Sequence, residues 1–173
     1  SSFRGVWRQA TPGELLSTVG SLATAVLADH PLFPAPDAEE WAFMLDWLQA
    51  WPLEAWLLCV DEQAVGFVLL QPDLAPAAVR AKGGRNPAWR AWLAWRKGRP
   101  ADAGRIVLGG VLPAWRRQGI GRALLQQAVG RAQGHGWQTL TIGPVLAESS
   151  GDQFLQAVGA TPQQRYALFA ADI

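Results

Sequence analysis

The sequence lacks the features that mark several large classes of protein. It has a single cysteine, Cys59, among 173 residues, so no internal disulfide framework can form. Its longest apolar runs fall far short of the roughly 20 residues that a membrane span needs, and no charged segment followed by an apolar run indicates a secretion signal. We therefore expect no membrane partner and a cytoplasmic location.

Neither sign of charge predominates in the chain as a whole. Lys and Arg number 15 and Asp and Glu number 14, which gives a formal net charge of +1. This balance gives no reason to expect nucleic acid as a partner, and no metal ligands are predicted. Because 50% of the residues are hydrophobic, the chain can bury a full core, and residues 1–173 are predicted to form a single domain.

One stretch, residues 105–134, combines an apolar run, a basic turn and an amphipathic pattern. Residues 106–112 are apolar, as in a buried strand, and Pro113 ends the pairing because it has no N–H to donate. Apolar side chains then recur at helical spacing, at Leu124, Leu125, Ala128, Val129 and Ala132. The stretch therefore predicts a strand, a turn and a helix in that order.

The turn itself is basic and contains two glycines, Gly119 and Gly121. A helix start leaves about four N–H groups without partners and carries partial positive charge. The glycines let the backbone approach a bulky ligand, and Arg116, Arg117 and Arg122 add full charge. On the turn alone, two interpretations stand: a site for phosphate or pyrophosphate, or an ordinary helix start with solvated arginines.

Two common phosphate-binding motifs are excluded. A P-loop needs G-x-x-x-x-G-K-[ST], and neither Lys nor Ser or Thr lies at this turn. A dinucleotide fingerprint needs G-x-G-x-x-G/A directly after a strand. Here Leu124 takes the third position, and residues 113–118 separate the strand from the first glycine.

The turn is similar to the acyl-CoA motif of the GNAT N-acetyltransferase family, [RQ]-x-x-G-x-[GA]. The matching residues are Arg116, Arg117, Gln118, Gly119, Ile120 and Gly121. The preceding residues resemble the V-x-P-x-[aromatic] sequence that leads into the motif: Val111, Leu112, Pro113, Ala114 and Trp115. The resemblance extends over nearly all of the chain. It implies an α/β (α+β) GNAT fold, with a mixed central sheet of about six to seven strands flanked by helices.

The resemblance also implies a cofactor, acetyl-CoA, and a way of binding it. The pantetheine arm is expected to pair with the backbone at Gly110, Val111 and Leu112. The pyrophosphate is expected to bind the N–H groups from Arg117 to Arg122.

The other elements follow from capping and periodicity. Capping boxes at Thr11 and Asp37 predict two helices, which line the acceptor side of the cleft in the family. Strands are predicted at residues 3–8, 55–60, 64–70, 138–142 and 165–170. Those at residues 55–60 and 64–70 are expected to form a hairpin. The strand at residues 138–142 is expected to run parallel to the strand at residues 106–112, which we call the cofactor strand. A short helix is predicted at residues 152–158. Cys59 is expected to be a small buried side chain and His135 a structural one.

An insertion, residues 74–105, separates the hairpin from the cofactor strand. It carries eight basic residues and only one acidic residue, so its net charge is +7 and that of the remaining chain is −6. A helix beginning at Asn86-Pro87 is predicted to bear three tryptophans, Trp89, Trp92 and Trp95. Two interpretations stand: a surface helix anchored by its tryptophans with solvated arginines, or a lid or docking surface for an anionic or extended acceptor or a partner protein.

The catalytic positions depart from the family pattern. Many members have a Tyr four residues before the glycine that closes the last helix, where this chain has Leu155. The region that supplies a Glu base in many members offers Gly143 and Pro144 here. We therefore name Glu148 as the candidate base and Tyr166 as the candidate acid. The structural alternatives are a solvated loop charge and a half-buried strand aromatic.

The resulting hypothesis is an acyl-CoA-dependent N-acyltransferase. It would transfer acetyl to a primary amine on a small molecule, peptide or protein by direct attack in a ternary complex. The alternative is a catalytically weak or inactive acyl-CoA-binding module that acts through its basic insertion. The sequence leaves open whether the chain is one half of a tandem protein and whether it forms a homodimer.

Overall fold

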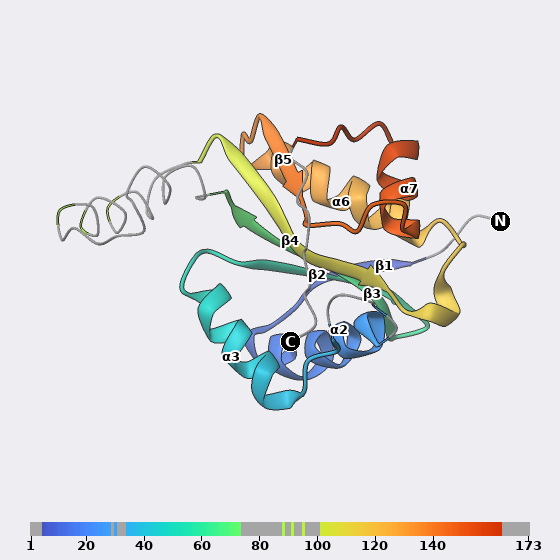
Figure 1. The fold of residues 1–173 in the computed structure, drawn as a ribbon. Helices are drawn as coiled ribbons and strands as arrows, with labels where there is room; N and C mark the ends of the chain where they lie inside the picture. Colours follow the sequence, from blue (N-terminus) through green and yellow to red (C-terminus); the bar gives the residue numbers. More distant parts are fainter. Residues whose placement is uncertain are drawn as a thin grey trace, which may run out of the picture. The chain divides into compact units, whose positions relative to one another are not determined.

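A five-stranded mixed sheet organises the fold (Figure 1). The computed structural model describes residues 5–28, 30, 34–73, 88, 91, 95 and 101–163. The strands are β1 (Val6–Gln9), β2 (Glu54–Val60), β3 (Gln63–Pro72), β4 (Ala103–Val111) and β5 (Thr139–Ile142). They lie side by side in sequence order, and only β4 and β5 run parallel. The mixed α/β fold and the parallel pair are thus confirmed, and the predicted strand at residues 165–170 lies outside the described residues.

The described chain divides into two compact units after Gly143. The first unit contains the sheet and the helices packed on it. The second contains α7 (Ser150–Ala157), where the Ser149 hydroxyl accepts a hydrogen bond of 3.2 Å from the Asp152 N–H at the helix start. Each unit is described by itself below.

The turn between β2 and β3 explains their register. Asp61 and Glu62 have φ angles of 46° and 66°, so both lie in the left-handed region, as a two-residue type I′ turn requires. Such a turn matches the twist of the two strands that it joins. The predicted hairpin is therefore confirmed, with Gln63 as the first residue of β3 instead of the last of the turn.

The first capping box begins a helical segment with three parts. The Thr11 side chain accepts from the Glu14 N–H at 3.4 Å, and a Glu14 carboxylate oxygen accepts from the Thr11 N–H at 2.9 Å. The segment comprises α1 (Pro12–Glu14), a π-helical stretch η1 (Leu15–Val19) and α2 (Gly20–Leu27). The sequence predicts one uninterrupted helix and does not reveal the π-helical stretch.

The second capping box begins α3 (Ala38–Gln49), as predicted. One Asp37 carboxylate oxygen accepts from the N–H groups of Glu39 and Glu40 at 2.9 and 2.8 Å. Trp41 ties α3 to η1, because its indole N–H donates to the Leu15 carbonyl at 2.9 Å. The same indole lies against Gly20, where a Cβ would come within 2.6 Å of the Trp41 ring. Glycine at this position therefore lets the two helices approach closely.

Two apolar clusters hold helices to opposite faces of the sheet. On one face, α2, η1 and α3 pack on side chains such as Leu57, Phe67 and Leu69. On the other face, α6 (Ile120–Gly134) packs on alternate strand residues such as Leu58 and Val68. This alternation is the period of two expected of strands buried on both faces.

The apolar stripe predicted for α6 is correct except at its edge. Ile120, Leu124, Ala128 and Ala132 are buried, whereas Val129 is 40% exposed. Its position, one residue after Ala128, turns its side chain away from the sheet. The core-facing stripe is therefore narrower than the apolar pattern of the sequence, and it begins at Ile120.

An ion pair between Arg8 and Glu14 predicts how stability depends on pH. Hydrogen bonds from the Arg8 guanidinium and from Thr11 lower the pKa of Glu14 to about 2. Because this pKa lies below its value in the unfolded chain, the ionised carboxylate stabilises the fold above about pH 4.5 and stops doing so as the pH falls towards 2. Glu14→Gln, which can keep the capping geometry, should reduce the free energy of unfolding at pH 6 and reduce it much less at pH 2. Urea unfolding of both proteins at the two pH values checks this, and an equal difference at both would contradict it.

Candidate cofactor site

The edge of β4 that faces β5 is open over the second half of the strand. The parallel strand β5 pairs only with residues 103–106 of β4, and its last partner pair is Ile106 and Ile142. No other described strand of the first unit continues this pairing along residues 107–111. The backbone N–H and C=O groups on this side are therefore available to an extended ligand that carries amides.

A β-bulge explains where the two strands separate. Leu69 and Leu70 of β3 pair with Leu108 and Ile106 of β4, so Val107 is an extra residue in β4. A bulge bends its strand and increases the local twist. The bulge directly follows Ile106, the last residue that β5 pairs with, so β4 bends away at that point.

The turn after β4 presents backbone N–H groups at the start of α6. It passes through a single 3-10 turn, η3 (Pro113–Trp115), and then through two residues in the left-handed region, Arg117 (φ 63°) and Gly119 (φ 83°). No described group accepts a hydrogen bond from the backbone N–H of any residue from Arg117 to Arg122, and no side chain caps the helix. The first bond of α6 is from Ala123 N to Gly119 O, at 3.1 Å.

These consecutive N–H groups have the arrangement that helix starts use to bind anions. Gln118, Gly119 and Arg122 are exposed, whereas Ile120 is buried and anchors the turn to the core. A Cβ at Gly119 would meet nothing within 4 Å, so the space next to the turn is open to a bulky group. The partial positive charge of the helix start and the exposed arginines favour a phosphate or pyrophosphate there.

Arg116 has partners within the protein. Its guanidinium donates to the Val111 carbonyl at 3.3 Å and to the Val26 carbonyl at 3.4 Å. It thereby joins the end of β4 to the last turn of α2. The sequence predicts this arginine as a cofactor contact, and the structure adds a role in fixing the turn.

Two close contacts at the end of β4 are not evident from the sequence. A Cβ on Gly110 would lie 2.4 Å from a methyl group of Val26, and a Cβ on Gly66 would lie 3.1 Å from the Gly110 carbonyl. Glycine at these positions lets α2 and β3 approach the strand that carries the open edge. Only the tertiary packing shows this, because the two contacts join residues 44 and 84 positions apart in the sequence.

Of the two predicted catalytic residues, one lies in the second unit and the other lies outside the described residues. Glu148 lies in the second unit, is exposed and has a φ of 60°, and its N–H donates to the Asp152 carboxylate at 3.0 Å. Tyr166 lies outside the described residues. Leu155, at the position where many family members have Tyr, lies in α7. Glu148 and Tyr166 therefore stay predictions.

A charged cluster at the far end of α6 has a structural character. Glu54 accepts from the Arg131 guanidinium at 3.0 and 3.2 Å and contacts His135 Nε2 at 2.6 Å. Burial would raise the pKa of Glu54, but hydrogen bonds from Arg131, Trp56 and His135 outweigh it and lower that pKa. His135 also stacks on Trp137, so the structural role predicted for it agrees with its contacts.

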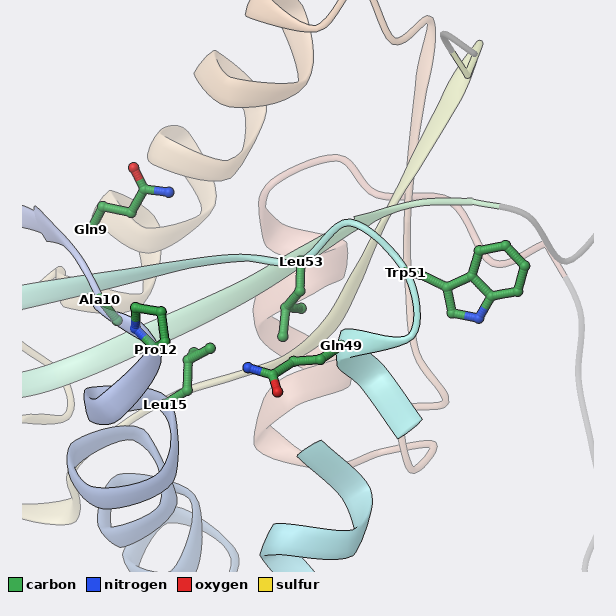
Figure 2. Close-up of a pocket in the computed structure, with 7 residues that line it drawn as sticks. All are labelled: Gln9, Ala10, Pro12, Leu15, Gln49, Trp51 and Leu53. Carbon is green, nitrogen blue, oxygen red and sulfur yellow. The ribbon is translucent and has the colours of Figure 1, made fainter. Parts of the chain in front are cut away.

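A surface pocket lies at the opposite end of the sheet from the turn (Figure 2). Its volume is about 390 Å³, and its walls are Gln9, Ala10, Pro12, Leu15, Gln49, Trp51 and Leu53. Leu15, Gln49 and Leu53 point toward one another, whereas the Trp51 indole points away from them (Figure 2). Because Gln9 ends β1 and Leu53 precedes β2, the pocket is separated from the cofactor turn by the length of the sheet.

The described residues contain neither a candidate metal site nor a candidate membrane span. No group of three or more His, Cys, Asp or Glu side chains among them is placed to hold a metal ion. No helix in the same part of the chain is long and apolar enough to cross a membrane.

A described sheet whose parallel pair of strands separates, and whose strand β4 leads into a helix start with unpaired N–H groups, is typical of the class of proteins that bind an extended, phosphate-bearing ligand. Comparison with known proteins identifies the class more closely. Residues 21–148, about three quarters of the chain, match the model of the acetyltransferase (GNAT) family. The chain therefore belongs to the GNAT acetyltransferase family.

Solved structures agree with this assignment at the level of the fold. The aminoglycoside acetyltransferase AAC(6')-Iy, in complex with a CoA bisubstrate analogue, has a TM-score of 0.63 at 16% identity, over 99% of this chain and 100% of that chain. A ribosomal-protein-alanine N-acetyltransferase from Brucella melitensis biovar Abortus 2308 has a TM-score of 0.63 at 18% identity, again over 99% and 100%. AAC(6')-Ih from Acinetobacter baumannii has a TM-score of 0.62 at 16% identity, over 98% and 99%. A search of the curated proteins finds no match.

Proposed function

We propose that residues 1–173 act as one acyl-CoA-dependent N-acyltransferase that transfers acetyl to a primary amine by direct attack in a ternary complex. The observation that carries the proposal is the open edge of β4 leading into the unpaired N–H groups of residues 117–122, in a chain of the GNAT family. The solved relatives act on aminoglycosides and on a ribosomal protein by their names, so both small-molecule and protein amines are candidate acceptors.

The residues at this site fit acetyl-CoA. The amides of a pantetheine arm can pair with the backbone at Gly110, Val111 and Leu112, as an added strand does. A pyrophosphate can bind the N–H groups from Arg117 to Arg122. When bound, acetyl-CoA supplies an activated acetyl thioester, which an amine attacks without a covalent enzyme intermediate.

The protein's own contribution is positioning and polarisation. Holding the amine and the acyl donor together lowers the entropic cost of reaction, and backbone N–H groups of the open β4 edge can polarise the carbonyl. Proton transfer by a side chain adds a further factor of roughly 10²–10⁴. We propose Glu148 as the base, acting directly or through water, and Tyr166 as the acid.

Glu148→Gln should lower kcat at neutral pH, and full retention of activity would remove Glu148 from the proposal.

The test of the proposed function is a panel of primary amines offered with acetyl-CoA. The panel contains an aminoglycoside, a polyamine, and peptides with a free N-terminus or a lysine. Release of free thiol that depends on both the enzyme and one of these amines is expected, with a matching mass increase of one acetyl group in that amine. No acylated product with any amine, in a protein shown to bind acetyl-CoA, would contradict the transferase proposal.

A second candidate function is a non-catalytic acyl-CoA-binding module. The observation that favours it is the absence of the usual acid and base, since Leu155 and Gly143 occupy those positions. The two functions share the cofactor site and differ in turnover, so the amine panel decides between them.

A further inference from the structure

The outward face of α3 carries large apolar side chains among acidic ones. Phe43 is 77% exposed and Trp47, one turn later, is 66% exposed. At 100° per residue, these two side chains lie opposite the buried Trp41, Leu45 and Leu48. Exposed Glu39 and Asp46 flank them on one side and exposed Glu40 on the other. We call these five exposed residues the α3 outer face.

No basic side chain of this part of the sequence neutralises the α3 outer face. Between Gln9 and Val79 the sequence has ten Asp and Glu residues and neither Lys nor Arg. The structure shows ion pairs of Arg8 with Glu14 and of Arg131 and His135 with Glu54 in this region. None of these ion pairs includes a residue of the α3 outer face. An exposed pair of aromatics within a negative surface is typical of a protein-binding site.

The same chain carries the complementary charge in one segment. Residues 80–105 contain eight basic residues, six of them Arg, against one acidic residue, and they include Trp89, Trp92 and Trp95. Of this segment, Ala88, Ala91 and Trp95 are described, and all three are helical. Arginine and tryptophan are the residues most enriched at the centres of interfaces, and a guanidinium also binds favourably over an aromatic ring.

We propose that the α3 outer face is an interface for a second copy of this chain, bound through that copy's basic segment, residues 85–99. Every copy has both surfaces, so a twofold pair makes the contact twice and compensates the charge of both surfaces at once. Phe43 and Trp47 supply the apolar centre, and the carboxylates around them supply the rim that selects a basic partner. This interface is independent of the cofactor site, and its test needs no activity.

Reversing the charge on one surface at a time tests the proposal. The face variant is Glu39→Lys with Asp46→Lys, which leaves the capping box of Asp37 and Glu40 intact. The segment variant is Arg85→Glu, Arg90→Glu, Arg96→Glu and Arg99→Glu, which changes the net charge of residues 85–99 from +5 to −3. The matched control for the face variant is Asp61→Lys with Glu62→Lys, the same change of charge in the exposed β2–β3 turn. Circular dichroism and thermal melts confirm that each variant is folded.

Sedimentation equilibrium is then measured for each protein alone and for the face and segment variants mixed. The native chain and the control are expected to dimerise, at least about tenfold more weakly in 1 M than in 0.1 M NaCl, because the Debye length falls from about 10 Å to about 3 Å. Each reversed variant alone should be monomeric at the same concentrations. Their mixture should form a heterodimer, since both contacts then join opposite charges again.

The other outcomes overturn the proposal. A native chain that is monomeric at low salt has no such interface, and monomeric variants that do not combine when mixed show that the segment contacts its own chain or nothing. Dimers that persist in both variants place the interface elsewhere. Phe43→Ser with Trp47→Ser should weaken the native dimer at least about tenfold, because exposed aromatics of this kind are the usual hot spots. A dimer that this change does not weaken would also overturn the proposal.

Discussion

Gly121→Glu is expected to weaken acetyl-CoA binding at least about 100-fold while leaving the protein folded. Gly121 lies in the first turn of α6, among the N–H groups that have no partner. A carboxylate there repels the pyrophosphate and accepts hydrogen bonds from the N–H groups that would otherwise bind it. Hydrogen bonds to a charged group contribute about 1.5–3 kcal/mol each. The helix itself gains, because glutamate has a higher helix propensity than glycine and an acidic side chain is favourable at a helix start.

A matched control for this change lies in the same helix. Gly130 is exposed in the third turn of α6, and a Cβ there would meet nothing within 4 Å. Gly130→Glu makes the same chemical change far from the turn, so it should raise stability slightly and leave the affinity for acetyl-CoA unchanged. Titration calorimetry and thermal melts of the three proteins separate the two effects. Equal affinity in both variants would show that the pyrophosphate does not bind at the start of α6.

Local chemistry explains why much of this fold can be predicted from sequence. The capping boxes at Thr11 and Asp37 satisfy backbone groups with side chains two or three residues away, and the structure contains both. Pro113 likewise marks the end of β4, and the glycines of the turn mark the start of α6, where Gly119 lies in the left-handed region. The parallel pairing of β4 and β5 follows from the helix between them. Parallel neighbours need a long crossover connection, usually a helix, whereas antiparallel neighbours can be joined by a tight turn.

The features that the sequence does not reveal arise from packing between distant segments. The bulge at Val107 opens the cofactor edge, yet nothing in residues 106–112 distinguishes it from a regular strand. The π-helical stretch of residues 15–19 lies under the Trp41 indole, 26 positions from Leu15. Val129 fits the apolar period of α6 but is 40% exposed. A one-dimensional pattern contains the period of an element and lacks the width of the surface against which it packs.

Gly110→Ala is expected to destabilise the protein by roughly 1–3 kcal/mol, the usual cost of inserting a methyl group into a packed contact. The new Cβ would lie 2.4 Å from one Val26 methyl group and 3.0 Å from the other, so α2 or β4 must move. For a chain of this length we expect a fall in Tm of roughly 2–10 °C. Acetyl-CoA binding should weaken as well, because the Val26 carbonyl accepts a hydrogen bond from Arg116. Thermal melts and calorimetry measure both effects.

The double variant with Val26→Ala decides how the contact acts. Removing the two methyl groups makes room for the new Cβ, so the two changes together should cost less than the sum of the single changes, by about 1 kcal/mol or more. If the losses in the free energy of unfolding are additive, β4 moves to accommodate the new Cβ and the contact with Val26 does not cause the loss. The affinity of the double variant for acetyl-CoA then separates two roles of Gly110. If stability and affinity both recover, the glycine serves to place α2, and with it Arg116, against the end of β4. If stability recovers and affinity does not, the ligand itself occupies the space that the missing side chain leaves at this edge.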